Sequence, residues 1–213
     1  KALGFDAMMF HDDDAVPDID GKSAAQLAKE SKELRKKLKD AGVVAEIVAP
    51  RLWFDPRTVD GAYTSNDPAH RKYAIERSLR CIDVANHLDC DLIVLWLARE
   101  GSYIRESKNA RRSVDFLVEA IDKMLAHDKR IRIAIEPKPN EPMDLAYVPT
   151  IGHALALSQL TRDPKRVGCP LGDQDRDGIL DTDDLCPNQP PGDKPDPSRK
   201  GCPLPDRDND GVV

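Results

Sequence analysis

The chain has 213 residues, of which 40% are apolar and 33% are charged, with a formal net charge of −6. No apolar run approaches the ~20 residues needed to cross a bilayer, so we predict no transmembrane segment. The charge is uneven: residues 168–213 carry 11 acidic and 5 basic residues, whereas residues 1–167 carry 27 of each. A balanced first part without a basic stripe argues against nucleic-acid binding. The change in composition at Gly168 predicts two regions of different kinds.

Apolar runs and helical patterns alternate along residues 1–167. Four short apolar runs recur about every forty residues, at positions 5–10, 43–48, 92–97 and 131–135. Because they are nearly continuous, they are typical of strands buried on both faces of a parallel sheet. Helical spacing follows at 23–41, from 68, across 114–125 and after 149. Ser23 and Gln26 form a capping-box pattern, and Pro68 suits a first helical position. The alternation predicts an α/β fold.

Polar residues follow each of the four predicted strands directly. In a parallel barrel the carboxyl ends of the strands share one rim, where active sites lie. One such cluster is typical of a solvated loop, but four clusters on one rim indicate a site. They are residues 11–14 (HDDD), 51–53 (RLW), 96–100 (WLARE) and 136–142 (EPKPNEP).

These clusters, in this order and spacing, resemble xylose isomerase, a (β/α)₈-barrel aldose–ketose isomerase. The resemblance extends over residues 1–167, about half of the family's barrel, and implies a partial TIM barrel of about four β/α units. Its most specific part is the run at 134–142 (AIEPKPNEP). The other parts are 9–14 (MFHDDD), 60–67 (DGAYTSND), 96–101 (WLAREG) and 149–154 (PTIGHA).

The resemblance implies roles for five residues at this rim. His11 would assist opening of the cyclic sugar, and Asp14 would orient its imidazole. Lys138 would donate to the substrate oxygen that gains charge as hydrogen moves between C2 and C1. Trp53 and Trp96 would wall the sugar site and exclude water, although either indole taken alone is more typical of ordinary packing. The implied substrate is an aldose, D-xylose, and the implied product is D-xylulose.

The resemblance also implies a divalent-metal site that these residues complete only in part. Glu136 would be a carboxylate ligand of Mg²⁺ or Mn²⁺. The family's other metal ligands lie on later strands and have no counterpart in this sequence. Because two-metal catalysis needs both ions placed, we expect the chain alone to be inactive. A second departure is the run APRLW at Ala49–Trp53, where the family has a run of the Thr-Thr-Asn-Leu-Phe type, and it leaves the substrate open.

The acidic region from Gly168 repeats itself at a period of 33 residues: GCPLGDQDRDG at 168–178 matches GCPLPDRDNDG at 201–211. Acids at loop positions 1, 3, 5 and 12 with Gly at position 6 are the pattern of an EF-hand-like loop. We therefore predict a Ca²⁺ site; for an isolated run of this kind the alternative is a disordered acidic linker. Its ligands would be Asp173, Asp175, Asp177, the carbonyl of Ile179, Asp181 and Asp184.

The five cysteines fall into two groups. Cys81 and Cys90 lie in patterned sequence and are expected to be buried free thiols. Cys169, Cys186 and Cys202 lie among Pro, Gly and Asp, where disulfides of an oxidising compartment are expected. The acidic region resembles thrombospondin type 3 repeats, and this resemblance implies that Cys186 pairs with Cys202. The barrel region predicts the cytoplasm, whereas the acidic region predicts the periplasm, the outer membrane or the exterior.

Three hypotheses remain open. The first is a composite of a partial isomerase barrel (1–167) and calcium-binding repeats (168–213), arising by fusion or truncation. The second is a non-catalytic envelope protein, in which calcium stiffens a spacer that carries a degenerate barrel. The third is a subunit completed by another chain. A half barrel has exposed strand edges and an uncovered inner face, so self-association is expected.

Overall fold

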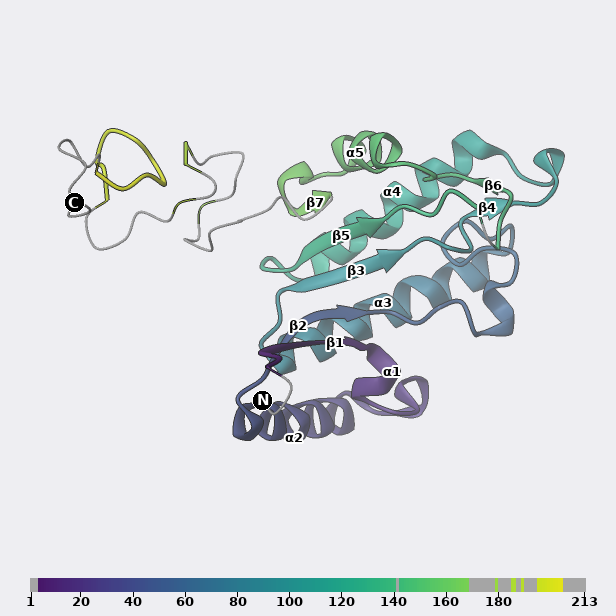
Figure 1. The fold of residues 1–213 in the computed structure, drawn as a ribbon. Coiled ribbons are helices and arrows are strands. Elements are labelled where there is room, and N and C mark those ends of the chain that lie inside the picture. Colours follow the sequence, from purple (N-terminus) through teal and green to yellow (C-terminus); the bar gives the residue numbers. More distant parts are fainter. Residues whose placement is uncertain are drawn as a thin grey trace. The chain divides into compact units, whose positions relative to one another are not determined.

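The computed structural model describes residues 4–140, 142–168, 179, 185–186, 189 and 195–204. The chain divides into two units, Lys1–Cys169 and Pro170–Val213. The described helices and the sheets lie in the first unit (Figure 1). Across the described ranges, no helix combines the length and the apolarity that crossing a membrane requires.

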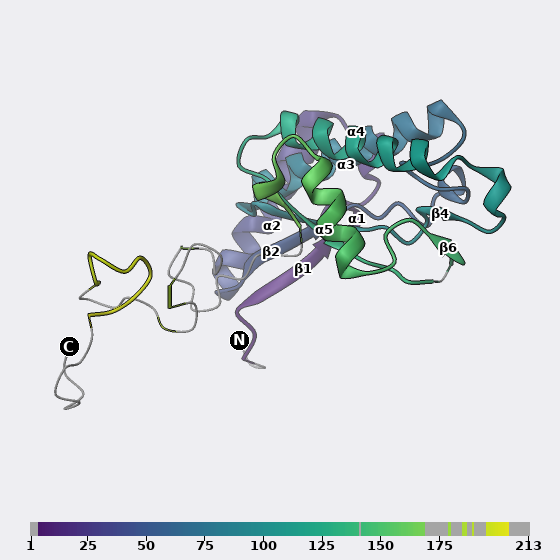
Figure 2. The same cartoon turned by 90° about the horizontal axis from the view of Figure 1, so that it is seen from above.

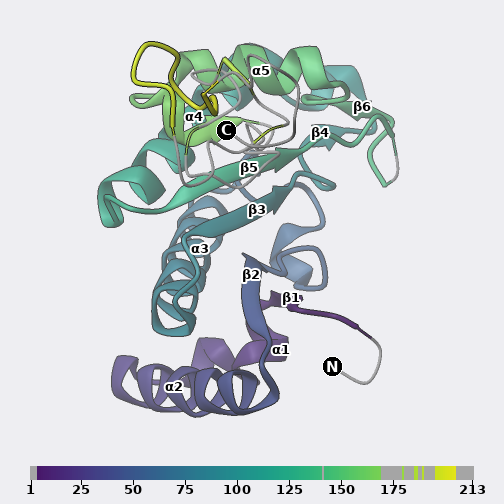
Figure 3. The same ribbon diagram turned by 60° about the vertical axis from the view of Figure 1, so that its left-hand side comes forward.

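Five parallel strands form the main sheet of the first unit. They are β1 (Ala7–His11), β2 (Val44–Ala49), β3 (Leu92–Trp96), β5 (Arg132–Glu136) and β7 (Val167–Gly168), in the spatial order β1-β2-β3-β5-β7. The strands follow an arc, with helices on its outer side (Figure 3). This arrangement confirms the predicted α/β fold and corresponds to part of a TIM barrel.

Helices connect successive strands. They are α1 (Asp12–Ala15), α2 (Ala24–Ala41), α3 (Pro68–Leu88), α4 (Ala110–His127) and α5 (Ile151–Leu160), with 3₁₀ turns at Ile19–Gly21, Pro56–Thr58, Arg105–Ser107 and Pro164–Arg166. The predicted start signals are confirmed: Ser23 and Gln26 form a reciprocal capping box on α2, and Pro68 opens α3. Gly42 ends α2 in the left-handed region at φ 66°.

The core lies between the sheet and the outer helices, which Figure 2 shows from above. Ile93 on β3 and Ile133 on β5 are at most 1% exposed and belong to one apolar cluster with Ile82 of α3 and Ile121 of α4. Full burial of each such side chain contributes about 1.5–3 kcal/mol. Packing against the helical layer therefore stabilises the sheet that carries the strand ends.

Burial of every strand on both faces was predicted, and this is wrong for β1 and for the start of β2. Met8 is 46% exposed, Met9 53% and Val44 57%. Among the described residues β1 is an edge strand, so its inner face and its free edge lack the neighbours that a closed barrel provides. Phe5, placed in the first strand by the sequence, precedes β1 and is 65% exposed.

Two short strands form a separate pair beyond the ends of β3 and β5. β4 (Gly101–Ser102) pairs antiparallel with β6 (Leu145–Ala146). A Cβ added at Gly101 would lie 2.6 Å from the carbonyl oxygen of Leu145. Glycine is therefore required where these two loops cross closely.

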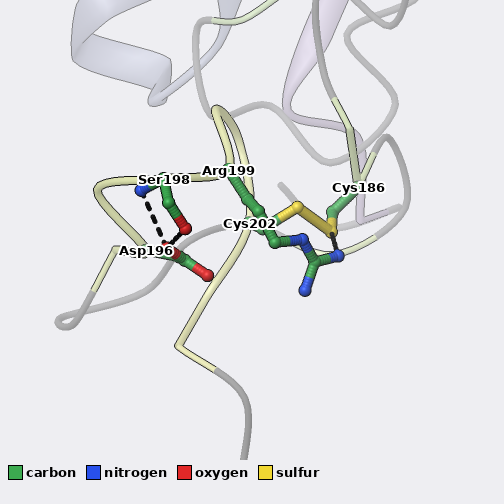
Figure 4. Close-up of a disulfide and its surroundings, with 5 residues drawn as sticks. All are labelled: Cys186, Asp196, Ser198, Arg199 and Cys202. Atoms are coloured by element: carbon green, nitrogen blue, oxygen red, sulfur yellow. Dashed lines mark hydrogen bonds between the residues drawn. A yellow bond between two sulfur atoms is a disulfide. The ribbon is translucent and has the colours of Figure 1, made fainter.

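The second unit contains a disulfide between Cys186 and Cys202, whose Cα atoms lie 5.1 Å apart. The guanidinium of Arg199 donates to Cys186 Sγ over 3.2 Å, and the carboxylate of Asp196 accepts hydrogen bonds from Ser198 (Figure 4). In the first unit, Cys81 and Cys90 are buried free thiols. The expected calcium ligands Asp173, Asp175, Asp177, Asp181 and Asp184 lie outside the described residues, and Ile179 is described without its neighbours.

Candidate sugar site at the strand ends

The strand ends bring four of the predicted site residues together. The rings of His11, at the end of β1, and Trp53, after β2, lie 5.1 Å apart between centroids in an edge-to-face arrangement. Trp53 meets Trp96, at the end of β3, at 4.5 Å and 89°. The Nζ atom of Lys138, after β5, lies 5.4 Å from the Trp96 ring centroid. An imidazole, two indoles and an ammonium group thus form one continuous row across four strand ends.

The indole rings of Trp53 and Trp96 pack tightly against each other. With Tyr63, Leu95 and Arg99 they line a cavity of about 10 Å³, which has room for about one water molecule. A sugar therefore does not fit between the indoles. It would have to lie on their open side, where Trp96 and Trp53 remain partly exposed.

Arg51 sits between His11 and the acidic turn that follows β1. Its Nη2 atom lies 2.6 Å from His11 Nδ1 and 2.5 Å from Asp14 Oδ2, and its Nη1 lies 3.3 Å from Asp13 Oδ1. Asp14 Oδ2 also lies 3.1 Å from His11 Nδ1. Asp14 is therefore close to His11, as expected, but Arg51 contacts the same nitrogen at a shorter distance.

The pKa values of two carboxylates in the acidic turn, Asp13 and Asp14, are shifted in opposite directions. Slight burial acts to raise the pKa of Asp14, but the hydrogen bond to His11 and the charge of Arg51 outweigh it and hold that pKa below its ordinary value. The pKa of Asp13 is raised, mainly by desolvation and then by the neighbouring charge of Asp12, against the attraction of Arg51 and Arg77.

Asp12 is a structural anchor of the site. Its side chain is fully buried and accepts hydrogen bonds from Arg77 on α3 over 2.6 and 2.9 Å. Asp12 Oδ1 also accepts the backbone N–H of Arg51 over 3.1 Å. One carboxylate thus links the ends of β1 and β2 to α3, and it fixes the backbone from which Arg51 and Trp53 project.

A second buried carboxylate organises the loop at 62–64. Glu100 accepts the backbone N–H groups of Ala62, Tyr63 and Thr64, together with the Thr64 hydroxyl, over 2.5–3.1 Å. Burial raises the pKa of Glu100, although these hydrogen bonds and the nearby Lys108 lower it. The sequence pointed to this loop and to Glu100 as parts of the resemblance, but not to their contact.

Glu136 ends β5 opposite Trp96 in the sheet register and is exposed. No group of three or more His, Cys, Asp or Glu side chains placed to hold a metal ion occurs among the described residues. Mg²⁺ and Mn²⁺ need several oxygen ligands, so Glu136 with its described surroundings does not fit the expected two-metal site. The expectation of an incomplete metal site remains a prediction.

Sequence reasoning assigned no role to Arg51 or Asp12, although both lie in clusters that it singled out. The available signal for Arg51 was its place in the run APRLW, where the family has a run of the Thr-Thr-Asn-Leu-Phe type. The sequence contains no signal for Asp12, because nothing in a run of three aspartates distinguishes the one whose side chain the backbone turns toward the interior.

A parallel sheet on an arc, outer helices, and polar and aromatic residues at the strand ends together define a part of a (β/α)₈ barrel. A family model described as the xylose isomerase-like TIM barrel matches residues 1–169. The chain belongs to this family.

Solved structures show the same fold at low identity. A D-psicose 3-epimerase determined in the presence of D-fructose is 20% identical with a TM-score of 0.55, covering 76% of this chain and 52% of that protein. The protein SMc04130 from Sinorhizobium meliloti 1021 is 24% identical (TM-score 0.52, 76% and 52%). A family 2 AP endonuclease from Brucella melitensis is 17% identical (TM-score 0.51, 76% and 56%). The chain thus spans about half the length of these proteins, and the likeness is one of fold.

Proposed function

We propose that residues 1–167 carry the sugar-binding half of an aldose–ketose isomerase site. The observation that supports this most strongly is the row of His11, Trp53, Trp96 and Lys138 across four strand ends. Aromatic faces bind the apolar faces of sugar rings, while an imidazole and an ammonium group address their oxygens. The resemblance to xylose isomerase supports D-xylose as substrate and D-xylulose as product.

Each residue has a distinct task in this proposal. His11 interacts with the ring oxygen during opening of the cyclic sugar. Lys138 donates to the substrate oxygen that becomes negative as hydrogen moves between C2 and C1. The two indoles exclude water from one side of the sugar. The divalent metal of the family polarises the substrate oxygens when bound, but the described residues of this chain do not form its site.

The chain offers a direct binding assay because Trp53 and Trp96 are its only tryptophans. Titration with D-xylose should change the intrinsic fluorescence in a saturable way. Trp53→Phe and Trp96→Phe should each retain part of the change, and Lys138→Met should weaken binding by about 10-fold, the loss of one charge-assisted hydrogen bond. A non-saturating response identical in Lys138→Met would contradict the proposed site.

Catalysis by the isolated chain is a separate question. Because Glu136 has no companion ligands among the described residues, interconversion of D-xylose and D-xylulose with Mg²⁺ or Mn²⁺ should stay at background. Turnover that disappears in both Glu136→Gln and Lys138→Met would show that the site is complete, contrary to the proposal.

An alternative role is that of a calcium-stiffened, non-catalytic spacer, and for it we propose that residues 173–184 bind Ca²⁺ as thrombospondin type 3-like repeats do. The supporting observation is the disulfide between Cys186 and Cys202, the pair that this resemblance implies. Calcium titration of the oxidised chain should show saturable binding that is lost in Asp175→Ala. Sugar binding by fluorescence, with or without calcium, then separates this role from the isomerase role.

A further inference from the structure

We infer that Arg51, rather than Asp14, sets the tautomer of His11 and holds the imidazole hydrogen on Nε2. Two groups compete for one atom of His11. Both Arg51 Nη2, at 2.6 Å, and Asp14 Oδ2, at 3.1 Å, lie within hydrogen-bonding distance of His11 Nδ1. An arginine can only donate and an ionised carboxylate can only accept. A neutral Nδ1 atom therefore serves one of the two and not both.

The shorter contact decides between them. If Nδ1 carried a hydrogen, that hydrogen would face the guanidinium of Arg51 at 2.6 Å, donor against donor. If Nδ1 carries its lone pair, one Nη2 hydrogen goes to His11 and the other to Asp14 Oδ2, 2.5 Å away. Asp14 Oδ2 and His11 Nδ1, which lie 3.1 Å apart, are then two acceptors that share the hydrogens of one NH₂ group.

The surroundings keep Arg51 in this position. Its backbone N–H donates to buried Asp12, and its Nη1 atom pairs with Asp13 at 3.3 Å. Its side chain is only 20% exposed. The carboxylate of Asp14 accepts a hydrogen bond from the other Nη2 hydrogen over 2.5 Å, which holds the guanidinium at this position. Of the two charged groups facing Nδ1, Arg51 at 2.6 Å favours a lone pair on this atom and Asp14 at 3.1 Å favours a hydrogen there, so the closer contact carries the inference.

This geometry reverses the role expected for Asp14. A carboxylate that accepted Nδ1–H would leave Nε2 as a base, whereas Arg51 leaves Nε2 with a hydrogen to donate. His11 would then donate a hydrogen bond to the ring oxygen of the sugar. This consequence rests on the proposed function, but the tautomer does not, so the two can fail separately. Arg51 is a positioning residue in this scheme, and it stands in the run where this chain departs from the family pattern.

The test is ¹⁵N NMR of the imidazole nitrogens in the full chain, at a pH where His11 is neutral. His11→Gln assigns the signal among the five histidines. The wild type should show a protonated Nε2 and an unprotonated Nδ1. Because free histidine also favours this tautomer, the variants are decisive: Arg51→Met should move the hydrogen to Nδ1, next to Asp14, whereas Asp14→Asn should leave it on Nε2.

Two results would overturn the inference: a wild-type His11 with Nδ1–H, or an Arg51→Met chain that keeps Nε2–H. The signals of His70, His87, His127 and His153 should be unchanged, which shows that each variant is folded. Should Arg51→Met fail to fold, the wild-type chain still tests the inference, since orientation of His11 by Asp14 predicts Nδ1–H there. Loss of sugar binding with the tautomers as stated would refute only the proposed function.

Discussion

The carboxylate of Asp12 and the guanidinium of Arg77 form a two-point ion pair, with Nε–Oδ2 at 2.6 Å and Nη2–Oδ1 at 2.9 Å, and their side chains are only 0% and 7% exposed. The pair joins the turn after β1 to α3. Since Asp12 also accepts the backbone N–H of Arg51, the pair fixes the position of the chain from which the Arg51 side chain projects.

Arg77→Met should destabilise the fold by about 3–5 kcal/mol, because it leaves the buried charge of Asp12 unpaired. Urea unfolding followed by circular dichroism measures the change. Arg132→Met is the matched control: its partner Asp91 and Arg132 itself are about half exposed, so its loss should cost less than about 1 kcal/mol. Equal effects of the two variants would contradict the anchoring role of Asp12.

Acid should weaken the fold partly through Asp55. The hydrogen bond from Arg57 outweighs desolvation and lowers the pKa of Asp55 from 3.8 to about 2. A depressed folded-state pKa gives stability that is present above the ordinary value and is lost as pH falls toward 2. Asp55→Asn should therefore flatten the pH dependence of the unfolding free energy between these values. Arg57→Gln should flatten this pH dependence to a similar extent, and the double variant should behave like either single variant. Additive effects would mean that a group other than Arg57 lowers the pKa of Asp55.

Two glycines should respond oppositely to alanine. At Gly101 a Cβ would lie 2.6 Å from the backbone oxygen of Leu145, which cannot move aside easily, so Gly101→Ala should cost about 1–3 kcal/mol. At Gly152, in α5, the nearest atom is 3.6 Å away, so Gly152→Ala should be neutral or stabilise by up to about 1 kcal/mol. Thermal melting of both variants checks this, and a tolerated Gly101→Ala would mean that the β4–β6 crossing is loose.

The uncovered part of the sheet should make the chain self-associate. Met8 and Met9 are about half exposed on the edge strand β1. Replacing both with Lys should shift sedimentation toward the monomer. Leu160→Lys is the control, since Leu160 is 60% exposed on α5, outside the sheet. A wild-type chain that sediments as a monomer would rule out this surface as an interface.

The sequence was sufficient for most of the fold because its signals are local. The capping box at Ser23, the proline at 68 and the apolar runs each depend on residues a few positions apart. The exposure of Met8 and Met9 could not be predicted in this way. An apolar run has the same pattern whether or not another layer of structure covers it, and its burial depends on distant neighbours.

The sequence was sufficient to predict which residues lie at the site, but not which of their side chains are in contact. Strand-end residues gather at one rim by the geometry of parallel sheets, which is why His11, Trp53, Trp96 and Lys138 meet. The long side chain of Arg51 reaches back to β1, and sequence spacing does not show where such a side chain points. The acidic run 12–14 is similar: one turn of helix directs Asp12 to Arg77, whereas Asp13 and Asp14 both reach Arg51.

Mapping the binding of D-xylose by ¹H–¹⁵N NMR on the full chain tests the proposed sugar site most directly. Shifts should concentrate on the two indole N–H signals and on residues near His11 and Lys138. They should be absent around a groove of about 440 Å³ between α3 and α4, lined by Phe116, Arg71 and Ile75 among others. Shifts confined to that groove, or none at either indole at saturating sugar, would contradict a sugar site at the strand ends.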